Sequence, residues 1–159
     1  MWAPWRLDYV VNADASEECF LCAALAADSD RERLLVERRQ RCFSILNRYP
    51  YNNGHMLIAP NAHKADLPEL DDDEMTDLMR LTRDTEERLR RAIEPDGFNI
   101  GINLGRCAGA GLPGHLHVHI VPRWNGDTNF MPVLGNTKVI VQSLDALYNL
   151  LCCPADATR

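Results

Sequence analysis

The sequence predicts an α+β fold in which an antiparallel sheet of about five strands packs with one long helix and one or two short ones. Short apolar segments with strand-like spacing are separated by turn residues, and one longer segment has helical spacing. These segments do not alternate regularly, as they would in a parallel sheet built from βαβ units. The strands are expected over residues 34–37, 41–47, 55–60, 98–104 and 115–121.

The first part of the chain is predicted to supply one short helix and three strands. Residues 19–27 have the spacing of a short helical turn, and the polar residues 28–33 are predicted to be a linker. Residues 34–37 and 41–47 have the pattern of a hairpin-like strand pair, and residues 55–60 have that of a third strand. Three strands are therefore expected before the long helix.

The long helix is predicted to begin near Asp71, since Asp71 and Glu74 have the spacing of a capping box and carboxylates favour the positive end of a helix. Apolar residues then recur at helical spacing, and this stripe is interpreted as core packing rather than as a cofactor site. Pro95 and Gly97 are expected to end the helix. Two strands and a short helix over residues 143–151 follow.

Length and charge are those of one compact domain. The chain has 159 residues, of which 46% are hydrophobic, and a formal net charge of −6. We expect a single domain over residues 1–153, including an N-terminal Cys-x-x-Cys segment, and a tail over residues 154–159. The acidic balance argues against nucleic acid as a partner. No segment has the pattern of a secretory leader or a membrane span, so we expect a cytoplasmic protein without a membrane partner.

Three histidines at alternate positions, His115, His117 and His119, are the most informative feature of the sequence. Side chains alternate between the two faces of a strand, so this spacing predicts three rings on one face, roughly 6–7 Å apart. A neutral imidazole is a nucleophile, a proton carrier and a metal ligand, so the pattern admits a histidine nucleophile or a zinc site. Structural histidines are the less favoured interpretation, because burying three titratable rings side by side is costly without hydrogen bonds or a metal.

The segment just before these histidines is rich in glycine. Gly105, Gly109, Gly111 and Gly114 allow backbone N–H groups to turn inward and surround an anion, for which phosphate is the natural partner. The spacing matches neither a dinucleotide-binding loop nor a Walker-type loop. A flexible connection is an equally common reason for such a loop, and its position beside the three histidines is what favours a phosphate site.

Residues 115–121, with the sequence His-Leu-His-Val-His-Ile-Val, resemble the signature of the histidine triad (HIT) family of nucleotide hydrolases and transferases. Residues 43–60 are similar to the strand, loop and strand that hold the nucleoside in that family. Residues 2–6 and 122–130 resemble its bacterial dinucleoside tetraphosphate phosphorylase-like branch. Together these segments cover most of the chain, and the resemblance implies a HIT-like fold.

The resemblance implies cleavage at the α-phosphorus of a nucleotide through a nucleotidyl-histidine intermediate, with no catalytic metal. His117 is the implied nucleophile, and His119 is the implied hydrogen-bond donor or proton carrier. An adenine nucleotide is the expected substrate, as a dinucleoside polyphosphate or a nucleoside phosphoramidate. The implied substrate-binding residues are Phe43, Ile45, Asn47, His55, Asn103, Gly109 and Gly111. From the residues alone, Phe43 and Ile45 fit the core equally well, and Asn47 fits a turn.

Cys19 and Cys22 form a Cys-x-x-Cys pair, for which a zinc half-site, a redox pair and coincidence are the alternatives. A redox pair is disfavoured, because the segment does not follow a strand in a βαβ unit. The resemblance implies that His63 and His115 complete a structural zinc site with the two cysteines. Two buried thiols packed beneath the sheet are the alternative.

Two features favour different acceptors for the nucleotidyl group. Branches of the family that use phosphate often carry glutamine at the position of His119, so the histidine favours water and a hydrolase. Residues 124–132, which flank it, resemble the phosphorylase-like branch instead. Hydrolysis is the preferred prediction, and phosphorolysis is the alternative.

A function of another class is a zinc-stabilised nucleotide-binding or interaction protein without significant turnover. A nucleotidyl adduct on His117 would separate the two classes. Members of the family commonly work as dimers, and Trp2 and Trp5 are expected to lie at an interface, so we expect a homodimer.

Overall fold

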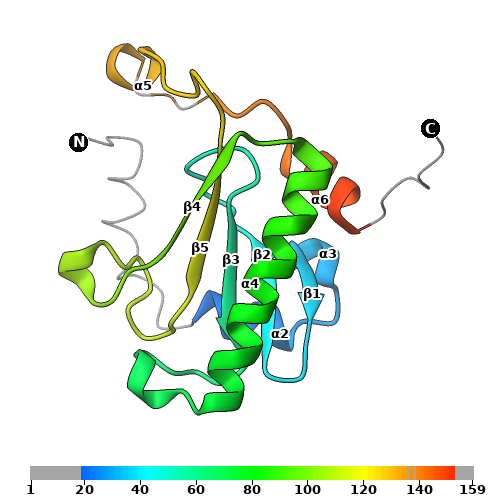
Figure 1. The fold of residues 1–159 in the computed structure, drawn as a ribbon, viewed down its shortest axis with the longest axis vertical. Coiled ribbons are helices and arrows are strands. Elements are labelled where there is room, and N and C mark those ends of the chain that lie inside the picture. The colour runs from blue at the N-terminus through cyan, green and yellow to red at the C-terminus, as the bar shows by residue number, and fades with distance from the viewer. Residues whose placement is uncertain (1–18, 136, 138, 153–159) are drawn as a thin grey trace.

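The structure is a computed structural model that describes residues 19–135, 137 and 139–152. Its centre is an antiparallel five-stranded sheet in the order β1-β2-β3-β5-β4 (Figure 1). The strands are β1 (Leu35–Arg38), β2 (Cys42–Leu46), β3 (Met56–Pro60), β4 (Gly97–Ile102) and β5 (Val118–Arg123). The predicted α+β class with an antiparallel sheet of about five strands is confirmed.

One long helix, α4 (Asp72–Ile93), crosses one face of the sheet and packs against β2 and β3 (Figure 1). It begins with the predicted capping box. Asp71 Oδ1 accepts the N–H of Glu74 at 2.7 Å, and Glu74 Oε2 accepts the N–H of Asp71 at 2.9 Å. Leu78, Leu81 and Leu89 are buried, so the apolar stripe is core packing, as expected.

The shorter helices are α2 (Phe20–Ala26), α3 (Asp30–Arg33), α5 (Met131–Leu134) and α6 (Leu144–Cys152). The prediction of a linker over residues 28–33 was wrong, because α3 lies there. Ser29 Oγ accepts the N–H of Glu32 at 3.4 Å, and Leu34 ends the turn with a left-handed φ of 63°. Serine followed three residues later by glutamate is a capping signal that could have indicated this turn.

Side chains alternate along each strand, so one set lies on the sheet face under α4 and the other set lies on the opposite face. Cys42 Sγ of β2 donates to Asp77 Oδ2 of α4 at 3.3 Å, so the odd-numbered positions of β2 point away from the helix. The strand pairing places Ile45 opposite Leu57 and Leu57 opposite His119, so these three side chains lie on the same face of the sheet. His119 therefore lies on the face away from α4.

The last strand starts later than predicted. β5 begins at Val118 and not at His115, so of the three histidines at alternate positions, His119 is the one that lies in the strand. The N–H of Leu116 donates to the carbonyl of Lys64 at 2.7 Å, which ties the segment before β5 to the segment after β3. His115 and His117 therefore do not follow the regular alternation of a strand, and their rings have different partners.

Some sequence predictions fall outside the described residues. These are the interface predicted at Trp2 and Trp5 and the tail over residues 154–159. Within the part of the chain that the structure describes, no helix is both long and apolar enough to cross a membrane.

Candidate functional site

Two cysteines and two histidines from separate segments meet at one end of the histidine row. Cys19 caps α2 and Cys22 lies in its first turn, whereas His63 follows β3 and His115 precedes β5. One ligand atom of each residue lies within 4.8 Å of the others. Cys22 Sγ is 3.2 Å from His63 Nδ1 and 3.4 Å from His115 Nδ1. Cys19 Sγ is 3.3 Å from His115 Nδ1. The structure brings together the four residues that the family resemblance implied as zinc ligands.

These separations fit a tetrahedral zinc ion. Zinc–sulfur bonds of about 2.3 Å and zinc–nitrogen bonds of about 2.0 Å place neighbouring ligand atoms about 3.3–3.8 Å apart. His115 Nε2 donates to the carbonyl of Pro60 at 2.9 Å, which leaves the lone pair on Nδ1 directed toward the cysteines. Burial, together with the hydrogen bond to Cys19 and its charge, raises the pKa of the Cys22 thiol to about 11. The Cys22 thiol therefore ionises at neutral pH only beside a cation.

His117 is held in the tautomer that a nucleophile requires. Its Nδ1 lies 2.8 Å from the carbonyl oxygen of His115. A carbonyl can only accept, so Nδ1 carries the proton and Nε2 carries the lone pair. The residue is 6% exposed, and burial lowers its pKa against the opposing effect of the His115 carbonyl. A neutral imidazole with its lone pair on Nε2 can attack an electrophilic phosphorus.

A chain of hydrogen bonds fixes the tautomer of His119. The backbone N–H of Tyr51 donates to His55 Nδ1 at 3.0 Å, so the proton of neutral His55 is on Nε2. That Nε2 lies 3.0 Å from His119 Nδ1, which accepts the hydrogen bond. His119 Nε2 then carries a proton of its own. Asn103 Nδ2 lies 3.5 Å from this atom, and because both are N–H donors, neither accepts a hydrogen bond from the other. His119 presents an N–H donor, and His55, which is 1% exposed, supports it from behind.

The glycine-rich loop lies beside this donor. Gly105 and Gly109 have φ angles of 78° and 89°, which only glycine adopts readily, and they flank a short 3₁₀ turn. A Cβ added at Gly109 would lie 3.9 Å from Asn103 Nδ2, so the loop backbone runs close to Asn103. Gly111 follows in the same loop and is partly buried. Of the glycines predicted to surround a phosphate, Gly109 therefore lies near Asn103 and His119, whereas Gly114 lies beside His63.

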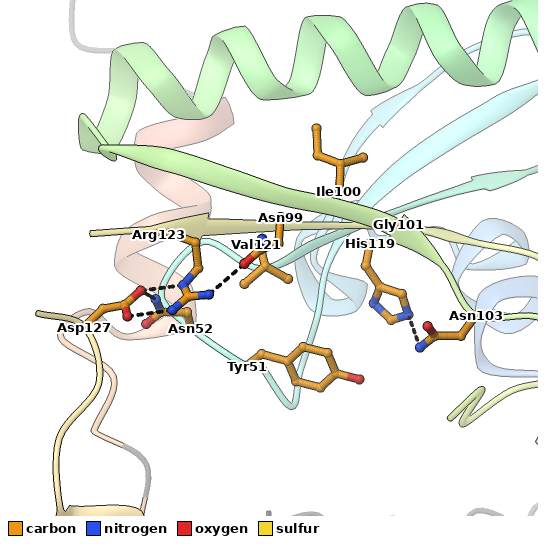
Figure 2. Close-up of a pocket in the computed structure, with 10 residues that line it drawn as sticks. All are labelled: Tyr51, Asn52, Asn99, Ile100, Gly101, Asn103, His119, Val121, Arg123 and Asp127. Carbon is orange, nitrogen blue, oxygen red and sulfur yellow. Dashed lines mark hydrogen bonds and ion pairs between the residues drawn. The ribbon is translucent and has the colours of Figure 1, made fainter. Parts of the chain in front are cut away.

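A cavity of about 360 Å³ extends from His119 along β5 (Figure 2). Arg123 lies at its far end, where Nε and Nη2 bind the two carboxylate oxygens of Asp127 at 2.6 and 2.8 Å. Nη1 of Arg123 donates to Asn99 Oδ1 at 2.7 Å. The ring of Tyr51 is nearly parallel to that of His119, at an interplanar angle of 17° and a centroid distance of 5.7 Å. The sequence predictions did not include Tyr51 or Arg123, although Arg123 follows His119 at the same even spacing.

The sequence model of the HIT domain matches residues 29–126. The chain belongs to the HIT domain family. This HIT protein is 39% identical over 158 residues to the AP-4-A phosphorylase of Mycobacterium tuberculosis, and the match covers 95% of this chain and 81% of that protein. It is 30% identical over 107 residues to the adenosine 5′-monophosphoramidase of Schizosaccharomyces pombe, covering 67% of this chain and 75% of that protein.

Solved HIT structures have the same fold. A Zn-bound histidine triad family protein from Mycobacterium smegmatis superposes with a TM-score of 0.68 at 25% identity, over 84% of this chain and 90% of that chain. A hypothetical histidine triad nucleotide-binding protein from Sulfolobus tokodaii superposes with a TM-score of 0.67 at 28% identity, over 84% of this chain and 89% of that chain. The predicted HIT-like fold is therefore confirmed.

Within this HIT domain, the three residues predicted to hold the nucleoside differ in exposure. Phe43 and Ile45 are 0% and 4% exposed and belong to the hydrophobic core. Asn47 follows β2, and its Oδ1 accepts the N–H of Tyr49 at 2.9 Å. The amide nitrogen of Asn47 lies 3.3 Å from His55 Nδ1. Contacts of these residues with a base or a ribose stay predictions.

Proposed function

We propose that the protein transfers a nucleotidyl group from an adenine dinucleoside polyphosphate to inorganic phosphate through a covalent intermediate on His117. The observation that carries this proposal is the tautomer of His117, which is buried and has its lone pair on Nε2. A covalent intermediate splits one difficult displacement at phosphorus into two easier ones. The name of the M. tuberculosis relative supports this class of substrate and reaction.

In the first step, His117 Nε2 forms a bond to the α-phosphorus while the bond from that phosphorus to the bridging oxygen breaks. The Nε2–H of His119 hydrogen-bonds to the leaving oxygen and stabilises the charge that develops there without transferring its proton, and His55 donates a hydrogen bond to Nδ1 of His119 from behind. Backbone N–H groups of the loop that contains Gly109 and Gly111 stabilise the charge on the non-bridging oxygens. With diadenosine tetraphosphate, the product that leaves is ATP.

In the second step, an oxygen of inorganic phosphate attacks the α-phosphorus of nucleotidyl-His117, and the phosphorus–nitrogen bond breaks. The product is ADP, and Nε2 regains its lone pair. Water in place of phosphate would give AMP.

Two observations support phosphate as the acceptor. The relative named as a phosphorylase matches 95% of the chain, whereas the phosphoramidase matches 67%. In addition, His119 presents an N–H to the site, as the amide of a glutamine would. The histidine therefore does not by itself favour water, which removes the reason for preferring hydrolysis on sequence alone.

Product analysis tests the acceptor. Diadenosine tetraphosphate is incubated with the protein with and without inorganic phosphate, at an ionic strength matched with sodium chloride. We expect ADP plus ATP in the presence of phosphate. AMP plus ATP under both conditions would identify a hydrolase and contradict the choice of acceptor.

The covalent step has a separate test. Protein mixed with labelled substrate and denatured at alkaline pH, where a phosphorus–nitrogen bond survives, should retain label, and His117→Asn should not. Nucleotide binding without turnover or label would identify a binding protein and contradict the proposed activity as a whole.

The proposal includes a structural zinc ion held by Cys19, Cys22, His63 and His115. Four protein ligands close the coordination shell, as in structural zinc sites, so the ion is not expected to contact the substrate. The Zn-bound protein from M. smegmatis supports this assignment. The bound ion would fix α2 to the segment before β5 and hold His115, whose carbonyl orients His117.

A homodimer is also part of the proposal. β4 is an edge strand of the sheet, and its residue Ile100 is 48% exposed. An edge strand with an exposed apolar side chain can pair with another chain, so a second copy of this protein is the expected partner. Light scattering should give twice the 18.0 kDa mass of one chain, and a monomeric mass would contradict the dimer. A single domain over residues 1–153, a cytoplasmic location and the lack of nucleic-acid and membrane partners stay predictions.

A further inference from the structure

We infer that the cavity between His119 and Arg123 binds the leaving half of the substrate, which is the nucleoside and the phosphates beyond the bond that breaks. The inference rests on the proposed function and deepens it. It assigns the protein a preference for dinucleoside polyphosphates over nucleoside phosphoramidates, and it makes Tyr51 a residue that determines this preference.

The cavity continues directly from the reacting histidine. His119, Val121 and Arg123 alternate on one face of β5, and Gly101 and Asn99 of β4 lie opposite the first two. Four strand rises, about 13 Å, separate the Cα atoms of His119 and Arg123. Because His119 is the donor to the bridging oxygen, the group that leaves with this oxygen begins at the His119 end of the cavity.

The size of the cavity distinguishes between leaving groups. Its volume of about 360 Å³ lies within the range of sites that enclose ligands of drug size. Ammonia, the leaving group of a simple phosphoramidate, occupies about as much space as one water molecule, or about 30 Å³. Ammonia would leave most of the cavity to solvent, whereas a nucleoside with its phosphates would displace that solvent.

Polarity changes along the cavity in the order that a nucleotide requires. Near the reacting bond, the side chains of His119 and Asn103 supply N–H donors for phosphate oxygens. The ring of Tyr51 lies along the cavity between this end and Arg123 (Figure 2). At the far end, two hydrogen bonds to Asp127 compensate the charge of Arg123. Phosphates therefore match the near end, and a base matches the aromatic ring and the far end.

Gly101 offers a way to fill the cavity without straining the fold. It lines the cavity opposite His119, and a Cβ added there would meet no atom within 4 Å. Gly97 lies on the same strand and also has no atom within 4 Å of an added Cβ, but it does not line the cavity. Gly101→Val therefore places an isopropyl group in the cavity, and Gly97→Val is the matched control.

The experiment compares kcat/KM for diadenosine tetraphosphate with kcat/KM for adenosine 5′-phosphoramidate. Gly101→Val should lower the ratio of the two values about tenfold, and Gly97→Val should leave the ratio within about twofold of the wild-type value. Tyr51→Leu keeps the backbone N–H that binds His55 but removes the ring, so it should lower the ratio by about tenfold, as the loss of base stacking does. Tyr51→Phe should retain the wild-type ratio. If the phosphoramidate reacts too slowly to measure, the inhibition constant of AMP, which lacks a leaving group, is the reference.

A wild-type ratio in both Gly101→Val and Tyr51→Leu would overturn the inference, as would an equal fall in Gly97→Val. Light scattering on Gly101→Val gives a further check. A change in its mass would mean that the cavity belongs to a contact between copies, which also overturns the inference. Failure of the proposed function is a separate outcome, in which the wild-type protein turns over neither substrate.

Discussion

His115 and His117 are two residues apart and both are buried, but their rings use opposite nitrogens. His115 donates from Nε2 to the Pro60 carbonyl and turns Nδ1 toward two cysteines. His117 donates from Nδ1 to the His115 carbonyl and keeps the lone pair on Nε2. For each of these two histidines, the backbone carbonyl that accepts from the ring decides which nitrogen keeps the lone pair. That choice makes His115 suited to bind a metal and His117 suited to attack phosphorus.

The largest effect on activity should come from replacing His117, which removes the lone pair that attacks phosphorus. We expect His117→Asn to lower kcat for diadenosine tetraphosphate by about four orders of magnitude or more, because the variant lacks the imidazole that forms the covalent intermediate. The affinity for AMP should change little, since the predicted base and ribose contacts remain. Product assays and titration calorimetry measure the two quantities. Activity within tenfold of the wild-type value would contradict the role of His117 as nucleophile.

An intermediate effect is expected at the metal end. Protein purified without added zinc should contain about one zinc ion per chain, and Cys22→Ser should lose it. Metal binding is coupled to folding, so we expect a loss of about 3 kcal/mol or more in the free energy of unfolding, which is about 6–12 °C in Tm. Cys107→Ser is the matched control, because Cys107 is an exposed thiol outside the cluster. Elemental analysis and thermal unfolding decide the outcome, and a metal-free wild-type protein of equal stability would remove the zinc site.

The smallest effect is expected at the far end of the cavity. Hydrogen bonds from Arg123 lower the pKa of the Asp127 carboxyl well below its usual range. A carboxyl whose pKa is lower in the folded state contributes stability above its unfolded pKa of about 4, and this contribution is lost as the pH falls below that value. Asp127→Asn should cost about 1 kcal/mol at pH 7, because the half-exposed Arg123 side chain is partly screened by solvent.

Urea unfolding at pH 7 and pH 3 measures this difference. The gap between wild type and Asp127→Asn should narrow at pH 3. A gap of constant size at both pH values would mean that the carboxylate charge does not stabilise this end of the cavity.

The features that the sequence predicted best depend on neighbours close in the chain. The capping box of α4 joins Asp71 to Glu74 within one helical turn, so its geometry follows from the spacing alone. Ser29 and Glu32 also make a capping contact within one turn. The polar composition of residues 28–33 nevertheless led to the prediction of a linker instead of a helix.

The parts that the sequence did not predict depend on contacts between distant segments. The start of β5 is set by a hydrogen bond between Leu116 and Lys64, which no periodicity in either segment indicates. Tyr51 reaches His119 only because the loop between β2 and β3 lies against β5. The supporting role of His55 likewise depends on its distance from His119 in the folded chain.

Tyr51 contributes to the site in two independent ways, one through its backbone and one through its side chain. Its backbone N–H fixes the tautomer of His55, and its side chain lines the cavity. Every amino acid except proline has that N–H, so the side chain at this position can change while the proton on His119 keeps its place. Substrate range and reaction chemistry are therefore separable in evolution at this position, since a single substitution can alter the first without a compensating change in the second.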